Sequence, residues 1–196
     1  MFSWTGLLFV LCGALTPALC CDWLRHYGHL SNASMTLIQL MGGQLTEQES
    51  PVPFPYKLYR QIRNAEVKSQ LVFIRDSLEL ISDLYLQNNF SSVPWDTVKT
   101  EHFLMGIHRQ IEELSTCVST NRSELEPTQR PGSKLKRYYR RLETSTLHRT
   151  GGSAASWEVI RKETKAHLDL LDLLVNSIRT AGADSRRRST PTHRQH

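Results

Sequence analysis

The stretch VKSQLVFIRDSLELISDLY, residues 67–85, carries the clearest helical pattern in the sequence. Its large apolar residues recur every three or four positions, at Val67, Leu71, Ile74, Leu78, Ile81 and Tyr85. This spacing places them on one face of an α-helix over about five turns, and a face of this kind is buried against other helices. The run NNFSS at residues 88–92 then ends the pattern.

The rest of the chain shows the same spacing of three and four, and no stretch keeps up an alternation of period two. We expect further long helices over residues 22–41, 94–118 and 153–181, and a short one over residues 57–64. A shorter basic helix carries Leu135, Tyr138, Tyr139 and Leu142 and is closed by residues 150–152. Glycine pairs at residues 42–43 and 151–152 are typical of helix ends. The sequence therefore predicts an all-α fold.

The connection between the first two long helices, residues 44–56, is long and contains Pro51, Pro53 and Pro55. Because proline is rejected from helix interiors and favours extended backbone, we expect this segment to cross the surface of the domain. An up-down-up-down bundle uses short loops, whereas the up-up-down-down topology of secreted helical cytokines needs a long overhand connection. The helical period alone does not separate these topologies. The loop favours an up-up-down-down four-helix core with a shorter fifth helix.

The first 20 residues have the pattern of a signal peptide. An apolar stretch at residues 7–11 is followed by Ala18-Leu19-Cys20, with small residues at both positions that a signal peptidase reads. Gly13 and Pro17 follow and break the apolar pattern, which is shorter than the roughly 20 residues needed to span a bilayer. We therefore expect a secreted, extracellular protein without membrane insertion. Its parts would be a signal peptide (1–20), a helical domain (21–181) and a basic disordered tail (182–196).

The position of signal-peptide cleavage determines which cysteines remain to form a disulfide. Cleavage after Cys20 removes two of the four cysteines and leaves Cys21 and Cys117. In an oxidising compartment these two are expected to pair, which would tie the mature N-terminus to a distant helix. Cleavage after Ala18 would instead leave Cys20 as an odd thiol, and an unpaired secreted cysteine invites dimerisation.

The formal net charge of +5 is unevenly distributed. One basic cluster precedes the last helix and a second lies in the tail, and they comprise Lys134, Lys136, Arg137, Arg140, Arg141 and Arg149, then Arg186, Arg187, Arg188 and Arg194. Blocks of this kind suit anionic partners. For a secreted protein, such partners are sulfated glycans or an acidic receptor patch, and secretion argues against nucleic acid.

Three acceptor patterns for N-glycosylation begin at Asn32, Asn89 and Asn121. Asn89 and Asn121 fall in predicted loops, which favours their use. Asn32 falls within a predicted helix.

The sequence gives little support for catalysis or for a cofactor. It has no G-x-S-x-G elbow, no glycine-rich phosphate loop and no H-E-x-x-H. His26 and His29 lie three positions apart, but no further ligand completes a recognisable metal set. We expect a protein that acts by interaction, with no catalytic, cofactor or metal site.

Three motifs resemble those of the type I interferons, and of the fish group with two cysteines in particular. They are CDWLR at residues 21–25, FP at 54–55 ahead of LYR at 58–60, and SWEVIRKE at 156–163. The last is similar to the Ala-Trp-Glu-Val-Val-Arg signature of the mammalian proteins, with Ser156 in place of alanine. The second disulfide of mammalian alpha interferons is absent, because Ala155 stands where its cysteine would be. The resemblance covers nearly all of residues 21–180.

This resemblance implies a five-helix cytokine that brings together two different class II cytokine receptor chains, the heterodimeric type I interferon receptor. Binding would start JAK-STAT signalling toward antiviral genes. In the family, one receptor chain contacts the first long loop and the last helix, while the other contacts the opposite side of the bundle.

The family pattern also suggests receptor-contact residues. Arg161 matches a family contact position, and Lys162, Lys165 and Ala166 occupy neighbouring contact positions with different residue types. Lys57 and Arg60 are added because we expect them to be exposed in the first loop. We expect Arg161→Ala to weaken binding to one receptor chain and to leave thermal stability nearly unchanged.

Two other classes remain open from the sequence. Another helical cytokine, of the interleukin-10 or lambda interferon type, would share the fold but usually has more cysteines. A lipid-binding bundle of apolipoprotein type is a further alternative, since amphipathic helices with basic faces can open on lipid. The long-range disulfide and the proline-rich loop argue against it. Sulfated-glycan binding is expected as an accessory activity, testable by removing residues 183–196.

Overall fold

The computed structural model describes residues 21, 23–119 and 131–189, and these residues contain helices and no strand. The elements are α2 (Trp23–Leu40), α3 (Tyr56–Arg63), α4 (Val67–Leu86), α5 (Thr97–Ser119), α6 (Pro131–Glu143), a short π-helix η2 (Thr144–His148) and α7 (Ala154–Ser189). The all-α prediction is confirmed. The predicted signal peptide lies outside the described residues, as does the stretch 120–130, which includes Asn121.

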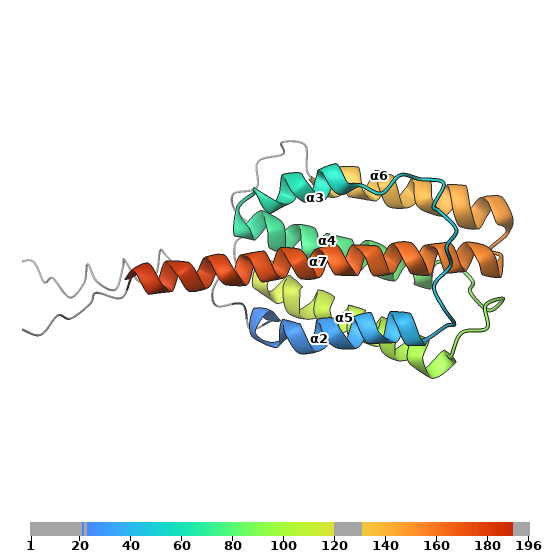
Figure 1. Ribbon diagram of the computed structural model, residues 1–196, viewed down its shortest axis with the longest axis horizontal. Helices are drawn as coiled ribbons and strands as arrows, with labels where there is room; N and C mark the ends of the chain where they lie inside the picture. The colour runs from blue at the N-terminus through green and yellow to red at the C-terminus, as the bar shows by residue number, and fades with distance from the viewer. Residues whose placement is uncertain (1–20, 22, 120–130, 190–196) are drawn as a thin grey trace, which may run out of the picture.

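The helices form a bundle of the predicted topology. In Figure 1, α2 and α4 run in one direction and α5 and α7 run in the other, which gives an up-up-down-down core. The connection at residues 41–55 crosses one end of the bundle to reach α3. The shorter helix α6 lies beside α3 and α4 as the fifth helix.

The core is built from the helix faces that the spacing predicts. In α4, the stripe from Leu71 to Tyr85 is buried, including Ile74 and Ile81 at 0% exposure. Trp157, at the start of the α7 stripe, is also 0% exposed and packs against Tyr85, Phe90 and Trp95. Its place in the core agrees with the sequence pattern.

A disulfide joins Cys21 to Cys117, with a Cα–Cα distance of 5.2 Å. It connects the chain two residues before α2 to the last turns of α5, and these two helices pack against each other. Closing a loop of roughly 100 residues is worth about 4 to 5 kcal/mol in the chain-entropy model.

The helices on either side of residues 149–153 each differ from the prediction at one end. The basic helix begins at Pro131, before its predicted start at Leu135, and extends through η2 to His148. Its predicted end agrees with the turn that follows, which contains Gly151 and Gly152 at φ of 65° and 72°. Helix α7 passes through Gly182 to Ser189, so the predicted end of this helix at residue 181 is wrong. One glycine costs a helix only about 1 kcal/mol, and its neighbours Ala181 and Ala183 are strong helix formers. Residues 190–196 lie outside the described residues.

No helix in the described part of the chain is both long and apolar enough to cross a bilayer.

Candidate functional site

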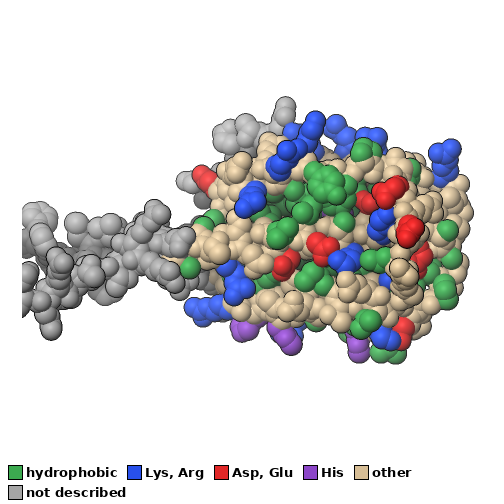
Figure 2. Space-filling model, in the orientation of Figure 1, with side chains coloured by type: hydrophobic (Ala, Val, Ile, Leu, Met, Phe, Trp, Pro, Cys, Tyr) green, Lys and Arg blue, Asp and Glu red, His purple; other side chains and the backbone are tan. Residues whose placement is uncertain are grey.

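Five of the candidate residues lie on α3 and α7, two helices that meet along a seam. Lys57 and Arg60 are exposed on α3, and Lys162, Lys165 and Ala166 are half-buried on α7. Helix α3 packs against α7, so the two groups lie on neighbouring helices. Figure 2 shows hydrophobic side chains at the surface over this seam, with Lys and Arg above them and Asp and Glu nearby.

An apolar groove opens between the two helices farther along the seam. This α3–α7 groove has a volume of about 280 Å³ and is lined by Tyr56, Tyr59, Arg60, Arg63, Leu170, Leu173 and Leu174. At its rim, Tyr56 is 60% exposed and Leu173 is 63% exposed. Large apolar side chains this exposed are typical of binding surfaces when they gather at one place.

This groove was not predicted from the sequence, although the sequence contains a signal for it. Helix α7 carries four leucines within residues 170–174, and a single buried stripe has room for only some of them. Leu171 and Leu174 take the buried positions, which leaves Leu173 at the surface.

The two lysines of α7 have different surroundings. Lys162 Nζ lies 2.9 Å from Glu49 Oε1 and donates to the carbonyls of Glu47 and Gln48 at 3.3 and 3.1 Å. It therefore ties the proline-rich connection to α7. Lys165 is paired with Asp169 on its own helix at 2.7 Å.

Arg161 lies in the interior, with 0% of its side chain exposed. Its guanidinium donates to the carbonyls of four residues at the end of α2 and just after it, Ile38 (3.1 Å), Gln39 (3.2 Å), Gly43 (2.7 Å) and Gln44 (3.3 Å). Glu158 Oε2 accepts two further hydrogen bonds from the same group. These contacts satisfy carbonyls that a helix end leaves without an intrahelical partner.

The hypothesis that Arg161 touches a receptor directly is therefore corrected. A side chain with no exposed surface makes no contact across an interface, and this one holds the end of α2 and the start of the long connection. The expectation that Arg161→Ala leaves stability unchanged is corrected for the same reason, since the substitution would remove a buried side chain and its hydrogen bonds to four carbonyls and Glu158.

Gly42 is adapted to this arrangement. A Cβ atom at this position would lie 2.9 Å from Trp95 Cδ1 and 3.1 Å from Arg161 Cζ. The Trp95 indole in turn donates to Glu158 Oε1 at 2.6 Å. The absence of a side chain at Gly42 lets the loop close over Arg161 and Trp95.

A cluster of aromatic rings packs beneath the α3–α7 groove and includes a buried histidine. His167 Nδ1 lies 2.6 Å from the hydroxyl of Tyr59, which lines the groove, and its ring packs against Phe54, Tyr138 and Tyr139. Burial lowers the pKa of His167 from 6.5 to about 3, so the ring is neutral at physiological pH. Nearby, Tyr138 donates to Glu163 at 2.5 Å, and burial raises the pKa of Glu163.

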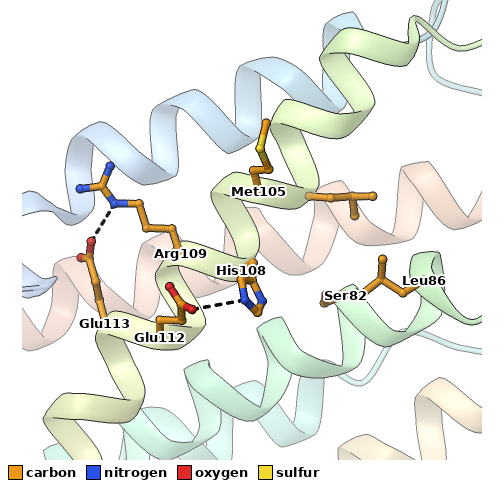
Figure 3. A pocket seen from close by; sticks show the side chains of 8 residues that line it. Ser82, Leu86, Met105, His108, Arg109, Glu112 and Glu113 are labelled. Carbon is orange, nitrogen blue, oxygen red and sulfur yellow. Dashed lines mark hydrogen bonds and ion pairs between the residues drawn. The ribbon is translucent and has the colours of Figure 1, made fainter.

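A second groove lies between α4 and α5, and Figure 3 shows it from close by. This α4–α5 groove has a volume of about 580 Å³ and is lined by Ser82, Leu86, Leu104, Met105, His108, Arg109, Glu112 and Glu113. Leu86 is 68% exposed and Met105 is 58% exposed. At the polar end, Arg109 pairs with Glu113 at 2.9 Å and His108 with Glu112 at 3.3 Å.

The two grooves open on different sides of the bundle. Helices α5 and α7 each pack against both α2 and α4, so they occupy diagonal positions in the core. One groove uses α7 and the other uses α5. The bundle therefore presents two separate apolar surfaces.

Of the three glycosylation patterns, two can be placed. Asn32 is exposed on α2, and Asn89 is exposed in the turn between α4 and α5. The Asn89 side chain accepts the backbone N–H of Ser91 at 2.8 Å. Within residues 21, 23–119 and 131–189, no three His, Cys, Asp or Glu side chains are grouped as metal ligands.

Comparison with protein families gives one match over most of the chain. Residues 25–178 match the family model described as an interferon alpha/beta domain. The match begins just after Cys21 and ends within α7, so it spans both grooves.

Individual relatives agree with this match. Interferon a3 of Oncorhynchus mykiss is 40% identical over 175 residues, which cover 89% of this chain and 95% of the trout protein. Human interferon omega-1 is 26% identical over 195 residues, covering 91% of this chain and 97% of the human protein. Among solved structures, zebrafish interferon 1 superposes with a TM-score of 0.73 at 30% identity, covering 80% of this chain and 99% of the zebrafish chain.

Proposed function

This chain belongs to the interferon alpha/beta family and is a type I interferon cytokine, and from that premise we propose that it brings together two class II cytokine receptor chains through its two grooves. Family membership implies binding to cytokine receptors. The observation that carries the finer proposal is the pair of exposed apolar grooves on different sides of one bundle.

The first receptor chain is assigned to the α3–α7 groove. Interfaces take most of their binding energy from a few large anchors at the centre, and exposed Tyr56 and Leu173 are of this kind. Lys57 and Arg60 lie on α3 beside them and would steer an acidic receptor surface toward the groove.

Arg161 and Lys162 support this interface by holding the chain that leads into it. Arg161 fixes the start of the long connection from inside, and Lys162 holds residues 47–49 of the same connection against α7. Because this connection leads into α3, both residues position the groove. We treat Arg161 as a positioning residue and Lys162 as a residue at the edge of the interface.

The second receptor chain is assigned to the α4–α5 groove. Leu86 and Met105 supply exposed apolar area, and the Arg109–Glu113 pair gives a polar rim. Methionine adapts its shape to a partner, which suits it to a contact surface.

The proposed setting is extracellular. The pattern of residues 1–20 is that of a signal peptide, and glycosylation at Asn32, Asn89 and Asn121 would follow from passage through the secretory route. Joining two receptor chains would bring their associated kinases together and start JAK-STAT signalling toward antiviral genes.

A reconstituted reporter assay tests this function. Purified protein is added to cells that express candidate pairs of class II cytokine receptor chains together with an antiviral-promoter reporter. We expect a response that needs both chains of one pair. Full activity with one chain alone, or silence with every type I interferon receptor pair from fish, would overturn the proposal.

A further inference from the structure

The outer face of α6 is a dense cluster of cations. Five exposed basic side chains occupy it, Lys134, Lys136, Arg137, Arg140 and Arg141. At 100° per residue they spread over one continuous arc of the helix, and from the first to the last they span about 10 Å along its axis. Every exposed side chain of α6 for which burial is described is basic, apart from Ser133. We name these five residues the α6 basic face.

The opposite side of α6 is firmly packed. Leu135 and Leu142 are 0% and 1% exposed, and Tyr138 and Tyr139 are also buried. The helix therefore presents its cations from a fixed backbone, and binding a partner would not require the helix to fold.

These cations are not neutralised within the described part of the chain. Elsewhere in that part, Arg75, Arg109 and Lys165 each pair with a carboxylate. No such pair forms at the α6 basic face in residues 21, 23–119 and 131–189. Asp83 and Glu143 line a groove of about 240 Å³ with Lys136 and Arg140, but neither comes within ion-pair distance of them. Glu143 instead accepts from Asn88 at 2.9 Å.

The positive surface continues onto the neighbouring helix. Helix α3 packs beside α6 and carries exposed Arg60 and Arg63. Figure 2 shows Lys and Arg side chains along the edge of the molecule formed by α3 and α6. A linear partner could follow this edge over two helices.

We propose that the α6 basic face binds a sulfated polysaccharide outside the cell. Clustered cations without intramolecular partners fit a flexible chain of sulfate groups by charge complementarity. A membrane fits less well, because adsorbed helices insert apolar side chains and the exposed face of α6 has none. The proposal rests on secretion, which is part of the proposed function, and it assigns to α6 a partner other than the receptor chains.

Binding of this kind has a measurable signature. A densely charged polyanion releases counterions when cations bind it, so the affinity falls as the salt concentration rises. In a plot of log affinity against log salt concentration, the steepness of the slope decreases by about one for each cation removed, as it does for nucleic acids. The slope therefore counts the cations that take part.

The test compares two variants with the same change in net charge. K134Q/R137Q/R141Q removes three cations from α6, and R186Q/R187Q/R188Q removes three from the end of α7. Full-length purified protein, with thermal melts as a folding control, is titrated against immobilised heparin at several salt concentrations. Desulfated heparin and vesicles of phosphatidylserine with phosphatidylcholine serve as the other probes.

We expect the α6 variant to bind heparin about tenfold or more weakly at physiological salt, with its salt slope reduced by about three. The α7 variant should keep most of the affinity, and neither desulfated heparin nor vesicles should bind comparably. Equal losses in the two variants would overturn the proposal in favour of net charge alone. Stronger binding to vesicles than to heparin would overturn it in favour of a membrane. Because the assay contains no receptor, its result is independent of the reporter assay.

Discussion

The guanidinium of Arg161 donates a 2.7 Å hydrogen bond to the carbonyl of Gly43, which lies 118 positions earlier in the chain. This contact joins the N-terminal part of the bundle's last helix to the start of its longest connection. Together with the bonds to Ile38, Gln39 and Gln44, it makes one buried side chain responsible for the path that leads into α3.

Replacing Arg161 should therefore unfold part of the bundle end as well as weaken binding. We expect Arg161→Ala to lower the free energy of unfolding by about 3 kcal/mol, because it empties the space of a fully buried side chain and removes six hydrogen bonds, to four carbonyls and the half-buried Glu158. Urea denaturation measures this. Lys162→Ala, on the same helix, is the control and should cost less than about 1 kcal/mol, since its pair with exposed Glu49 is screened by solvent. Unchanged stability of Arg161→Ala would contradict the assignment.

Adjacent glycines give a sharper test of the same packing. Gly42→Ala places a methyl group against Trp95 and Arg161, and we expect it to destabilise the protein by about 1 to 3 kcal/mol. Gly43→Ala is the matched control, because a Cβ there meets nothing within 4 Å. The two melting temperatures should differ clearly, and equal melting temperatures would show that the space at Gly42 is not needed.

Acid should destabilise the protein through His167. Its pKa is about 3 in the native state and 6.5 in the unfolded chain, so between these values only the unfolded chain takes up the proton. The contribution of His167 to the free energy of unfolding is therefore fully present above about pH 6.5 and is lost as the pH falls toward 3. The total loss is about 4 to 5 kcal/mol.

His167→Gln isolates this effect. Glutamine can still accept from Tyr59 but does not titrate, so the stability difference between wild type and variant should shrink as the pH falls from 7 to 4. The comparison matters because Glu163, whose pKa is raised, favours the native state as the pH falls and acts in the opposite direction. A difference that stays constant with pH would contradict a neutral buried histidine.

The rim of the α3–α7 groove should matter for binding and not for folding. We expect Tyr56→Ala and Leu173→Ala each to weaken binding to one receptor chain by about 1 to 3 kcal/mol of binding free energy. Biosensor titration measures this loss, and the melting temperature should stay close to that of the wild type. Val98→Ala, at 58% exposure on α5, removes a similarly exposed apolar side chain outside both grooves. If it weakened binding as much, the groove would have no special role.

Much of the fold could be predicted because each long helix buries a stripe that repeats at the helical period. The stripe of α4, the proline-rich connection and the pairing of Cys21 with Cys117 can all be inferred from spacing and compartment. Helix ends are harder. Gly182 is a possible stop signal, but α7 passes through it because flanking alanines outweigh the small cost of one glycine.

The candidate site was harder to predict from the sequence, because the partners of its side chains come from distant segments. Arg161 lies four positions after Trp157 and three before Thr164, which puts it on the buried stripe of α7, and this spacing was a signal that it faces inward. Its charge and its match to a family contact position suggested instead that the side chain is exposed. The Lys162 contacts could not be inferred, since the accepting carbonyls lie more than 100 positions away in an irregular connection.

The central claim is that two separate grooves engage two different receptor chains. The most direct measurement is the affinity of each purified receptor ectodomain for two double variants, Tyr56→Ala with Leu173→Ala and Leu86→Ala with Met105→Ala. We expect the first variant to lose binding to one receptor chain and to keep binding to the other, and the second variant to show the reverse. Loss of the same chain by both variants, or full binding of both chains by either, would contradict the account.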